Sequence, residues 1–247
     1  MFDRFVNAIT TGFLMFILSI SRATAGDTSE LNILGFSEDG GIFAFEEYGV
    51  QDGSGFPYAN RFYIDVDKDS FLSGSPIRVR IEDETASLNA ARDQAKAAGQ
   101  AIIADDILLA NKGLLTGFNP VTELSANPFR MAVNPRQALP PIDARLEVFL
   151  EEKPFLPTGQ CEGIADTIYG FRLLQVATEP GAVTKLLADD QSVPGSRRCP
   201  LGYGIGAIQT FYPQAGDPVF ATLIAVRSFG FEGPDFRWMA VTSRMTP

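Results

Sequence analysis

Three acidic side chains, Glu46, Glu47 and Asp52, form a dense carboxylate group beside a glycine-rich segment. Hydrolysis of a glycosidic bond needs two carboxyl groups about 5–10 Å apart across a cleft. Adjacent residues of a strand point to opposite faces, so Glu46 and Glu47 cannot line one site together. Either of them could act with Asp52 as acid and base. We favour the other interpretation, a solvated strand face followed by a turn.

Asp65, Asp67 and Asp69 have the D-x-D-x-D spacing that opens a calcium-binding loop. The rest of that pattern is missing, because the sixth position is Ser70 instead of glycine and the twelfth is Pro76 instead of glutamate. We therefore interpret the segment as a strand end followed by a polar turn. The three aspartates stay as calcium candidates on their spacing alone.

The sequence contains no histidine. This excludes Ser-His-Asp and Cys-His nucleophiles and nearly all catalytic zinc sites. Residues 202–207 match the G-x-G-x-x-A dinucleotide pattern, but they follow Cys199-Pro200 instead of a strand, and no helical period comes after them. A strand with close backbone packing explains these glycines better. We therefore expect no cofactor and a protein that is not an enzyme.

The chain has two cysteines, Cys161 and Cys199. An even number of cysteines in an exported chain favours a disulfide. Closing a loop of this length stabilises a fold by roughly 4 kcal/mol in the chain-entropy model. We predict that the two cysteines are bonded to each other, and the alternative is two separate buried thiols.

The prediction of export rests on the N-terminal segment. Residues 8–20 are mostly apolar, and residues 23–25 (Ala-Thr-Ala) form the small-x-small pattern that signal peptidase cuts behind. The apolar run is shorter than the roughly 20 residues that a membrane-spanning helix needs. We predict a secretion signal over residues 1–25, cleaved behind Ala25, and a periplasmic or secreted protein whose mature chain has no membrane span. An uncleaved anchor is the alternative, because the charged side chains at the start cancel.

Charge narrows the range of partners. The net charge is −10. Nucleic acid and anionic lipid surfaces are bound by clustered lysine and arginine, so this charge disfavours both. We expect no nucleic acid, and a protein or an envelope component as the partner.

Strand patterns cover most of the chain. Residues 61–66 and 77–81 alternate apolar and polar side chains, which predicts an antiparallel meander with one face in water. Residues 219–226 are apolar on both faces and predict a central strand. The other predicted strands are residues 31–36, 42–45, 146–150, 171–176, 203–212 and 237–243.

The pattern changes to a helical period between residues 85 and 115. Its apolar stripe consists of Leu88, Ala91, Ala95, Ala98 and Ile102. The stripe is rich in alanine, so we expect this segment to pack closely against a sheet. The predicted fold is α+β and mainly antiparallel β, with blade-like or sandwich-like sheets and one helical insertion at about residues 85–115. We expect residues 26–247 to form a single domain.

Four segments carry a resemblance to a known family: residues 35–40 (GFSEDG), 43–49 (FAFEEYG), 51–58 (QDGSGFPY) and 230–235 (GFEGPD). From about Leu31 to Thr242 the chain resembles the bacterial "predicted secreted protein" family, whose function is unknown. The resemblance implies export and one β-rich unit. It implies no catalytic residue for any position of this chain.

The leading hypothesis is a non-enzymatic, envelope-associated binding module. Rigid sheets often display binding residues on loops, so we expect residues 48–58 and 230–235 to be its binding surfaces. The alternative is a carboxylate-dependent hydrolase of envelope glycan that uses Glu46 or Glu47 with Asp52.

Overall fold

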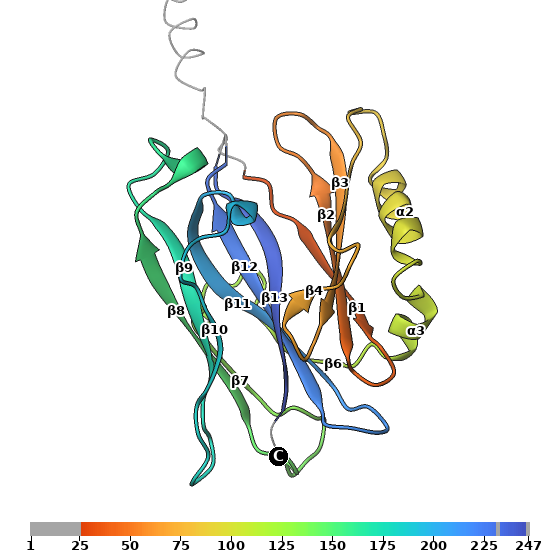
Figure 1. Ribbon diagram of the computed structural model, residues 1–247, viewed down its shortest axis with the longest axis vertical. Coiled ribbons are helices and arrows are strands. Elements are labelled where there is room, and N and C mark those ends of the chain that lie inside the picture. The colour runs from red at the N-terminus through yellow and green to blue at the C-terminus, as the bar shows by residue number, and fades with distance from the viewer. Residues whose placement is uncertain (1–25, 231–232, 246–247) are drawn as a thin grey trace, which may run out of the picture.

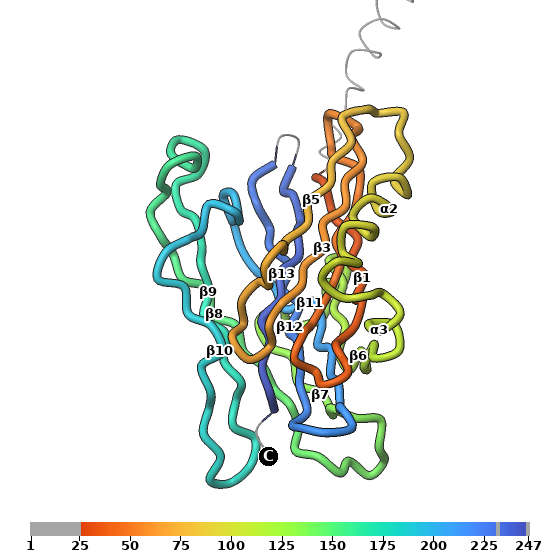
Figure 2. The backbone as a smooth tube through the Cα atoms, turned by 45° about the vertical axis from the view of Figure 1, so that its right-hand side comes forward, coloured from red at the N-terminus to blue at the C-terminus, as the bar shows by residue number. Residues whose placement is uncertain are grey.

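The structure is a computed structural model that describes residues 26–230 and 233–245. Its elements form four layers (Figure 1): a pair of helices, a first sheet, a central sheet and a third sheet. Figure 2, turned by 45°, shows the same order of layers. The predicted secretion signal, residues 1–25, lies outside the described residues, so the signal and its cleavage behind Ala25 stay predictions.

All strand pairs within the three sheets are antiparallel. The first sheet has the order β1-β2-β3-β4, and β5 pairs with β3. The central sheet has the order β13-β12-β11-β6, and the third sheet β10-β9-β8-β7. The mainly antiparallel β fold predicted from the sequence is confirmed.

The strands have the following bounds: β1 Glu30–Phe36, β2 Ile42–Val50, β3 Pro57–Asp65, β4 Ser70–Phe71, β5 Ile77–Arg80, β6 Leu114–Phe118, β7 Arg130–Val133, β8 Leu146–Phe155, β9 Ile168–Gln175, β10 Lys185–Asp189, β11 Pro200–Phe211, β12 Val219–Ser228 and β13 Asp235–Arg244. The helices are α2 Leu88–Gly99 and α3 Asp105–Ala110, with the 3-10 turns η1 Gly159–Cys161 and η2 Gly195–Arg197.

The central sheet is buried on both faces. On one face Ile224 packs with the third sheet, and on the other Leu223 packs with the first sheet. This confirms the prediction that residues 219–226 form a central strand, since β12 lies between β11 and β13. Two apolar interlayers, one on each side of the central sheet, therefore hold the layers together.

The helical insertion covers the outer face of the first sheet (Figure 1). Ser87 caps α2, its hydroxyl oxygen accepting a hydrogen bond from the Ala90 N–H at 3.2 Å. Ala91 and Ala95 are fully buried, as the stripe predicted, but Ala98 is exposed and Gly99 is buried in its place. The buried face continues at Gly99, where the Tyr63 hydroxyl occupies the space that a side chain would need.

Two expectations about the first sheet are wrong. The face of β3 predicted to be wet is buried, because α2 and α3 cover it and enclose Arg61 and Tyr63, whereas Arg78 and Arg80 of β5 are exposed. The predicted glycine-rich loop is also shorter than expected, since β2 extends to Val50 and β3 begins at Pro57. Strands β4, β6, β7 and β10 were not predicted, and each has only two to five residues.

Cys161 and Cys199 form a disulfide, which confirms the predicted pairing. The bond joins η1 to the residue before β11, across a sequence separation of 38. Within residues 26–230 and 233–245, no helix has the length and apolar character needed to cross a membrane.

Candidate functional site

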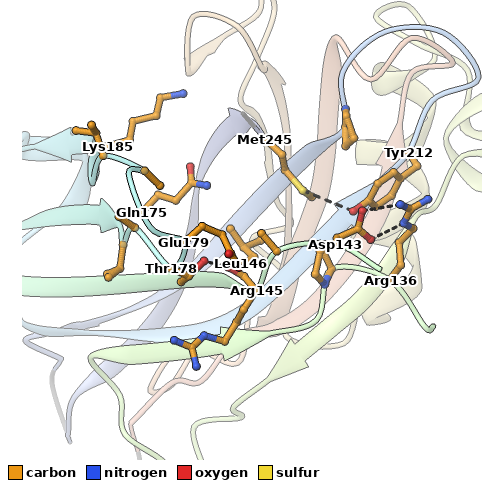
Figure 3. A pocket seen from close by; sticks show the side chains of 17 residues that line it. Arg136, Asp143, Arg145, Leu146, Gln175, Thr178, Glu179, Lys185, Tyr212 and Met245 are labelled. Carbon is orange, nitrogen blue, oxygen red and sulfur yellow. Dashed lines mark hydrogen bonds and ion pairs between the residues drawn. The ribbon is translucent and has the colours of Figure 1, made fainter. Parts of the chain in front are cut away.

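A cavity of about 740 Å³ opens at one end of the interlayer between the central and third sheets (Figure 3). We call it the end pocket, and its key lining residues are Arg136, Leu146, Gln175, Lys185, Tyr212 and Met245. They come from the start of β8, the end of β9, the start of β10 and the segments that follow β7, β11 and β13. The pocket therefore forms where the ends of these six strands lie together.

The interlayer is hollow at this end because the large core side chains stop. Leu146 is the last buried leucine of β8 at this end, and beyond it the lining includes small residues such as Ala144, Ala177 and Ala182. Most of the exposed lining is apolar. Protein interiors are close-packed, so an opening of this size is wide enough for a ligand of several carbon atoms.

Gln175 is the last residue of β9, and it lies on the inward face of the strand. It pairs in register with Val148, which is buried in the interlayer core, and it follows Phe171 and Leu173 on the inward face. Its amide oxygen is buried and has no hydrogen-bond partner among the described residues. A buried acceptor without a donor costs about 1–3 kcal/mol, so a donor that reached this oxygen would stabilise the protein.

Charged groups lie around the pocket, and several of them are hydrogen-bonded. Figure 3 shows Gln175 and Lys185 on one side and Arg136, Asp143 and Tyr212 on the other. Lys185 Nζ donates to the hydroxyl of Ser243 at 2.8 Å. Arg136 Nε donates to Asp143 at 2.6 Å. That hydrogen bond holds the pKa of the Asp143 carboxyl below its usual value, so this carboxylate stays ionised.

Tyr212 forms the apolar wall beside this ion pair. The Arg136 guanidinium lies over the Tyr212 ring, 4.4 Å from its centroid, and the Tyr212 hydroxyl lies 3.9 Å from the Met245 sulfur. Burial raises the pKa of the Tyr212 hydroxyl, so it remains protonated at neutral pH. This wall offers a flat aromatic surface and a flexible thioether for packing against an apolar ligand.

The predicted acidic candidates lie apart from the end pocket. Glu46 is buried under α2, where it accepts a hydrogen bond from Arg92 at 2.8 Å. Glu47 points to the opposite face and accepts the Trp238 backbone N–H at 2.7 Å. Burial raises the pKa of Glu47, although the hydrogen bonds from Trp238 and Asn60 lower it. The opposite orientation of the two glutamates agrees with the alternation expected from the sequence.

Asp52 is exposed in the loop between β2 and β3. It lines a hollow of about 420 Å³ together with Gly230 and Asp235, so the two loops predicted as binding surfaces do meet there. Neither Glu46 nor Glu47 lines this hollow. Residues 231–232 of the second loop lie outside the described residues, and the role of the loops stays a prediction.

The three calcium candidates have separate partners. Asp65 accepts a hydrogen bond from Lys68 at 2.7 Å, Asp67 from Arg244 at 2.6 Å, and Asp69 from the Thr242 N–H at 2.7 Å. In the described part of the chain, no three histidine, cysteine, aspartate or glutamate side chains are grouped to hold a metal.

The glycines of residues 202–207 lie in β11, as the sequence interpretation predicted. The Trp238 ring lies against Gly206 and occupies the space of a side chain there. The residues of the end pocket were missed by sequence reasoning. One local signal for them exists: Gln175 is polar at a position where the alternation of β9 calls for an apolar side chain.

The fold and the pocket define a class: a disulfide-bonded, layered antiparallel β protein with an apolar pocket at the end of one interlayer. The chain belongs to the family described as "Predicted secreted protein (DUF2259)", which matches residues 44–244. The resemblance stated from the sequence is thereby confirmed. No curated protein and no solved structure shows a significant match to the chain.

Proposed function

We propose that this protein is an exported binding protein and that its end pocket holds a small amphipathic component of the cell envelope. The apolar body of the ligand lies between the central and third sheets, against Leu146 and Met245. A hydroxyl or N–H group of the ligand donates to the amide oxygen of Gln175. The observation that carries this proposal is the buried oxygen of Gln175, which has no partner among the described residues, in a wall whose exposed surface is mostly apolar.

The size and chemistry of the pocket support a binding role. Ligand sites commonly measure about 300–1,000 Å³ and combine apolar walls with a few polar groups, and the end pocket has about 740 Å³. We favour binding over hydrolysis of envelope glycan for two reasons. Glu46 and Glu47 are enclosed by structural partners, and neither of them lines the hollow that Asp52 lines.

The compartment is part of the same proposal. The family is described as predicted secreted proteins, and the disulfide suits an oxidising environment. We place the protein in the periplasm or outside the cell, as a single domain over residues 26–247, after removal of residues 1–25.

The binding proposal is tested by filling the pocket. Ala177 lines it, and Ala177→Trp places an indole in the cavity. The probe is dansylaminoundecanoic acid, a fluorescent fatty acid whose sulfonamide N–H can donate to Gln175. We expect saturable binding by the wild type and a loss of at least about tenfold in affinity for Ala177→Trp, since apolar contact with the cavity is removed.

The matched control is Ala97→Trp, at an exposed position of α2 away from the pocket, and it should bind as the wild type does. Absence of saturable binding by the wild type contradicts the proposal. Equal binding by Ala177→Trp and Ala97→Trp, with both variants folded by circular dichroism, contradicts it as well.

A further inference from the structure

Lys185 lies beside Gln175 in the end pocket. The two residues are paired in register between β10 and β9, and both line the cavity. Side chains of such a pair in an antiparallel sheet lie on the same face, with their Cβ atoms about 4.5–5.5 Å apart. Figure 3 shows the two on the same side of the cavity. A cationic side chain therefore neighbours the residue whose buried amide oxygen has no partner among the described residues.

The ammonium group of Lys185 reaches across the interlayer to the central sheet. Its Nζ donates to the hydroxyl oxygen of Ser243 in β13 at 2.8 Å. That hydroxyl in turn donates to the carbonyl oxygen of Arg244 at 3.1 Å. A lysine ammonium has three N–H donors, and the partner of Lys185 among the described residues is a neutral hydroxyl. Positive charge and further donors therefore remain available at the wall of the pocket.

The other two basic residues of the lining are already paired with carboxylates. Arg136 donates to Asp143 at 2.6 Å, and Arg145 Nη2 lies 3.0 Å from Glu147 Oε2. In the part of the chain that the structure describes, Lys185 takes part in no ion pair. Lys185 is therefore the cation of the lining that can receive an anionic group of a ligand.

A single cation without a carboxylate partner matches a single negative charge. A carboxylate carries one negative charge, whereas a phosphate monoester carries about −1.5 to −2 at pH 7. Glu179 also lines the cavity, from an exposed position in the loop between β9 and β10. Its negative charge further disfavours a doubly charged head group. We therefore favour a carboxylate over a phosphate.

We propose that the ligand of the end pocket is an anionic amphiphile with a hydrogen-bond donor next to a carboxylate, as in an N-acyl amino acid. The inference rests on the proposed function, because it names the ligand class of the same cavity. The acyl chain lies in the apolar interlayer, the N–H donates to the Gln175 oxygen, and the carboxylate accepts from Lys185 Nζ. One carbon separates the N–H from the carboxylate in such a ligand, which suits two side chains whose Cβ atoms are about 5 Å apart.

Calorimetric titration with N-decanoylglycine and N-decanoylglycinamide tests this inference. The two compounds share the acyl chain and the N–H, and they differ in charge. We expect the wild type to bind the acid at least about tenfold more tightly than the amide, because a hydrogen bond between two charged groups is stronger than one to a neutral group. Lys185→Met keeps a long unbranched side chain but removes the ammonium, so this variant should lose the preference.

The matched control is Lys112→Met, which changes the net charge by the same amount. Lys112 is exposed between α3 and β6 and does not line the cavity. This variant should keep the wild-type preference for the acid. Circular dichroism establishes that both variants are folded, and the comparison of the two compounds in the wild type needs no variant.

The outcomes separate this inference from the binding role of the pocket. Equal affinity of the wild type for the two compounds overturns the anionic ligand class and leaves the pocket proposal intact. An unchanged preference in Lys185→Met overturns the pairing of the carboxylate with Lys185. Tighter binding of N-decanoylaminomethylphosphonate than of N-decanoylglycine overturns the choice of a carboxylate. A wild type that binds dansylaminoundecanoic acid but neither glycine compound overturns the ligand class alone, and one that binds none of the three overturns the proposed function with it.

Discussion

At the scale of single residues, Gln175 links the fold to the proposed function. Its neighbours on the inward face of β9, Phe171 and Leu173, are fully buried in the core. An apolar residue at this position would continue that core. The chain instead places a buried amide oxygen there without a partner among the described residues. Such a group lowers stability, and under our proposal a ligand supplies the missing donor.

This cost predicts a gain of stability when the amide is removed. Gln175→Leu keeps a similar side-chain volume and eliminates the unsatisfied oxygen. We expect the free energy of unfolding of the ligand-free protein to rise by about 1–2 kcal/mol. Urea unfolding followed by circular dichroism measures it. A loss of stability of similar size would show that Gln175 is satisfied in the free protein.

Individual acidic residues show what the sequence could and could not predict. The alternation of a strand was enough to place Glu46 and Glu47 on opposite faces of β2. Their partners were not predictable, because Arg92 and Trp238 lie 46 and 191 positions away in the chain. The spacing of Asp65, Asp67 and Asp69 likewise carried no information about Arg244 and Thr242, which bind two of them.

At the scale of elements, the helical insertion determines the outer face of the first sheet. Arg61 of β3 pairs with Asp105 at the start of α3, Nη1 to Oδ1, at 2.7 Å. Arg61 and Tyr63 alternated with apolar residues in the sequence, which predicted a wet face. The alternation of polar and apolar residues is the same whether the polar side chains meet water or charged residues of a covering helix. The sequence pattern of β3 therefore could not predict that helices cover this face.

Close packing between α2 and β3 predicts that a glycine-to-alanine substitution in α2 lowers the stability of the protein, the opposite of its usual effect. Replacing a glycine inside a helix by alanine normally stabilises by about 1 kcal/mol. A methyl group at Gly99 would overlap the Tyr63 hydroxyl. We expect Gly99→Ala to destabilise the protein by about 1–3 kcal/mol, measured by urea unfolding.

The double variant supplies the control. In a Tyr63→Phe background the hydroxyl is gone, and Gly99→Ala should destabilise the protein less than it does in the wild type, with the Cζ atom of the ring still 3.0 Å from the added methyl. A Gly99→Ala protein more stable than the wild type would contradict the packing described between α2 and β3.

At the scale of the whole molecule, the disulfide and the mainly antiparallel fold were predictable, and the end pocket was not. Cysteine number and export pointed to the pairing of Cys161 with Cys199. The pocket is built where β7, β8, β9, β10, β11 and β13 begin or end, so its wall combines positions from 135 to 245. No local sequence pattern predicts that strand ends so far apart in the chain lie together. The one local signal is Gln175, a polar residue at an inward position of β9.

Two probes measure directly whether the Gln175 oxygen accepts a hydrogen bond from a bound ligand. Affinities of the wild type and Gln175→Leu are compared for dansylaminoundecanoic acid and for its N-methylated sulfonamide, which has no donor. The wild type should prefer the N–H probe by about tenfold, and Gln175→Leu should lose this preference while still binding both probes. An equal preference in the two proteins would contradict the claim that this oxygen recognises the ligand.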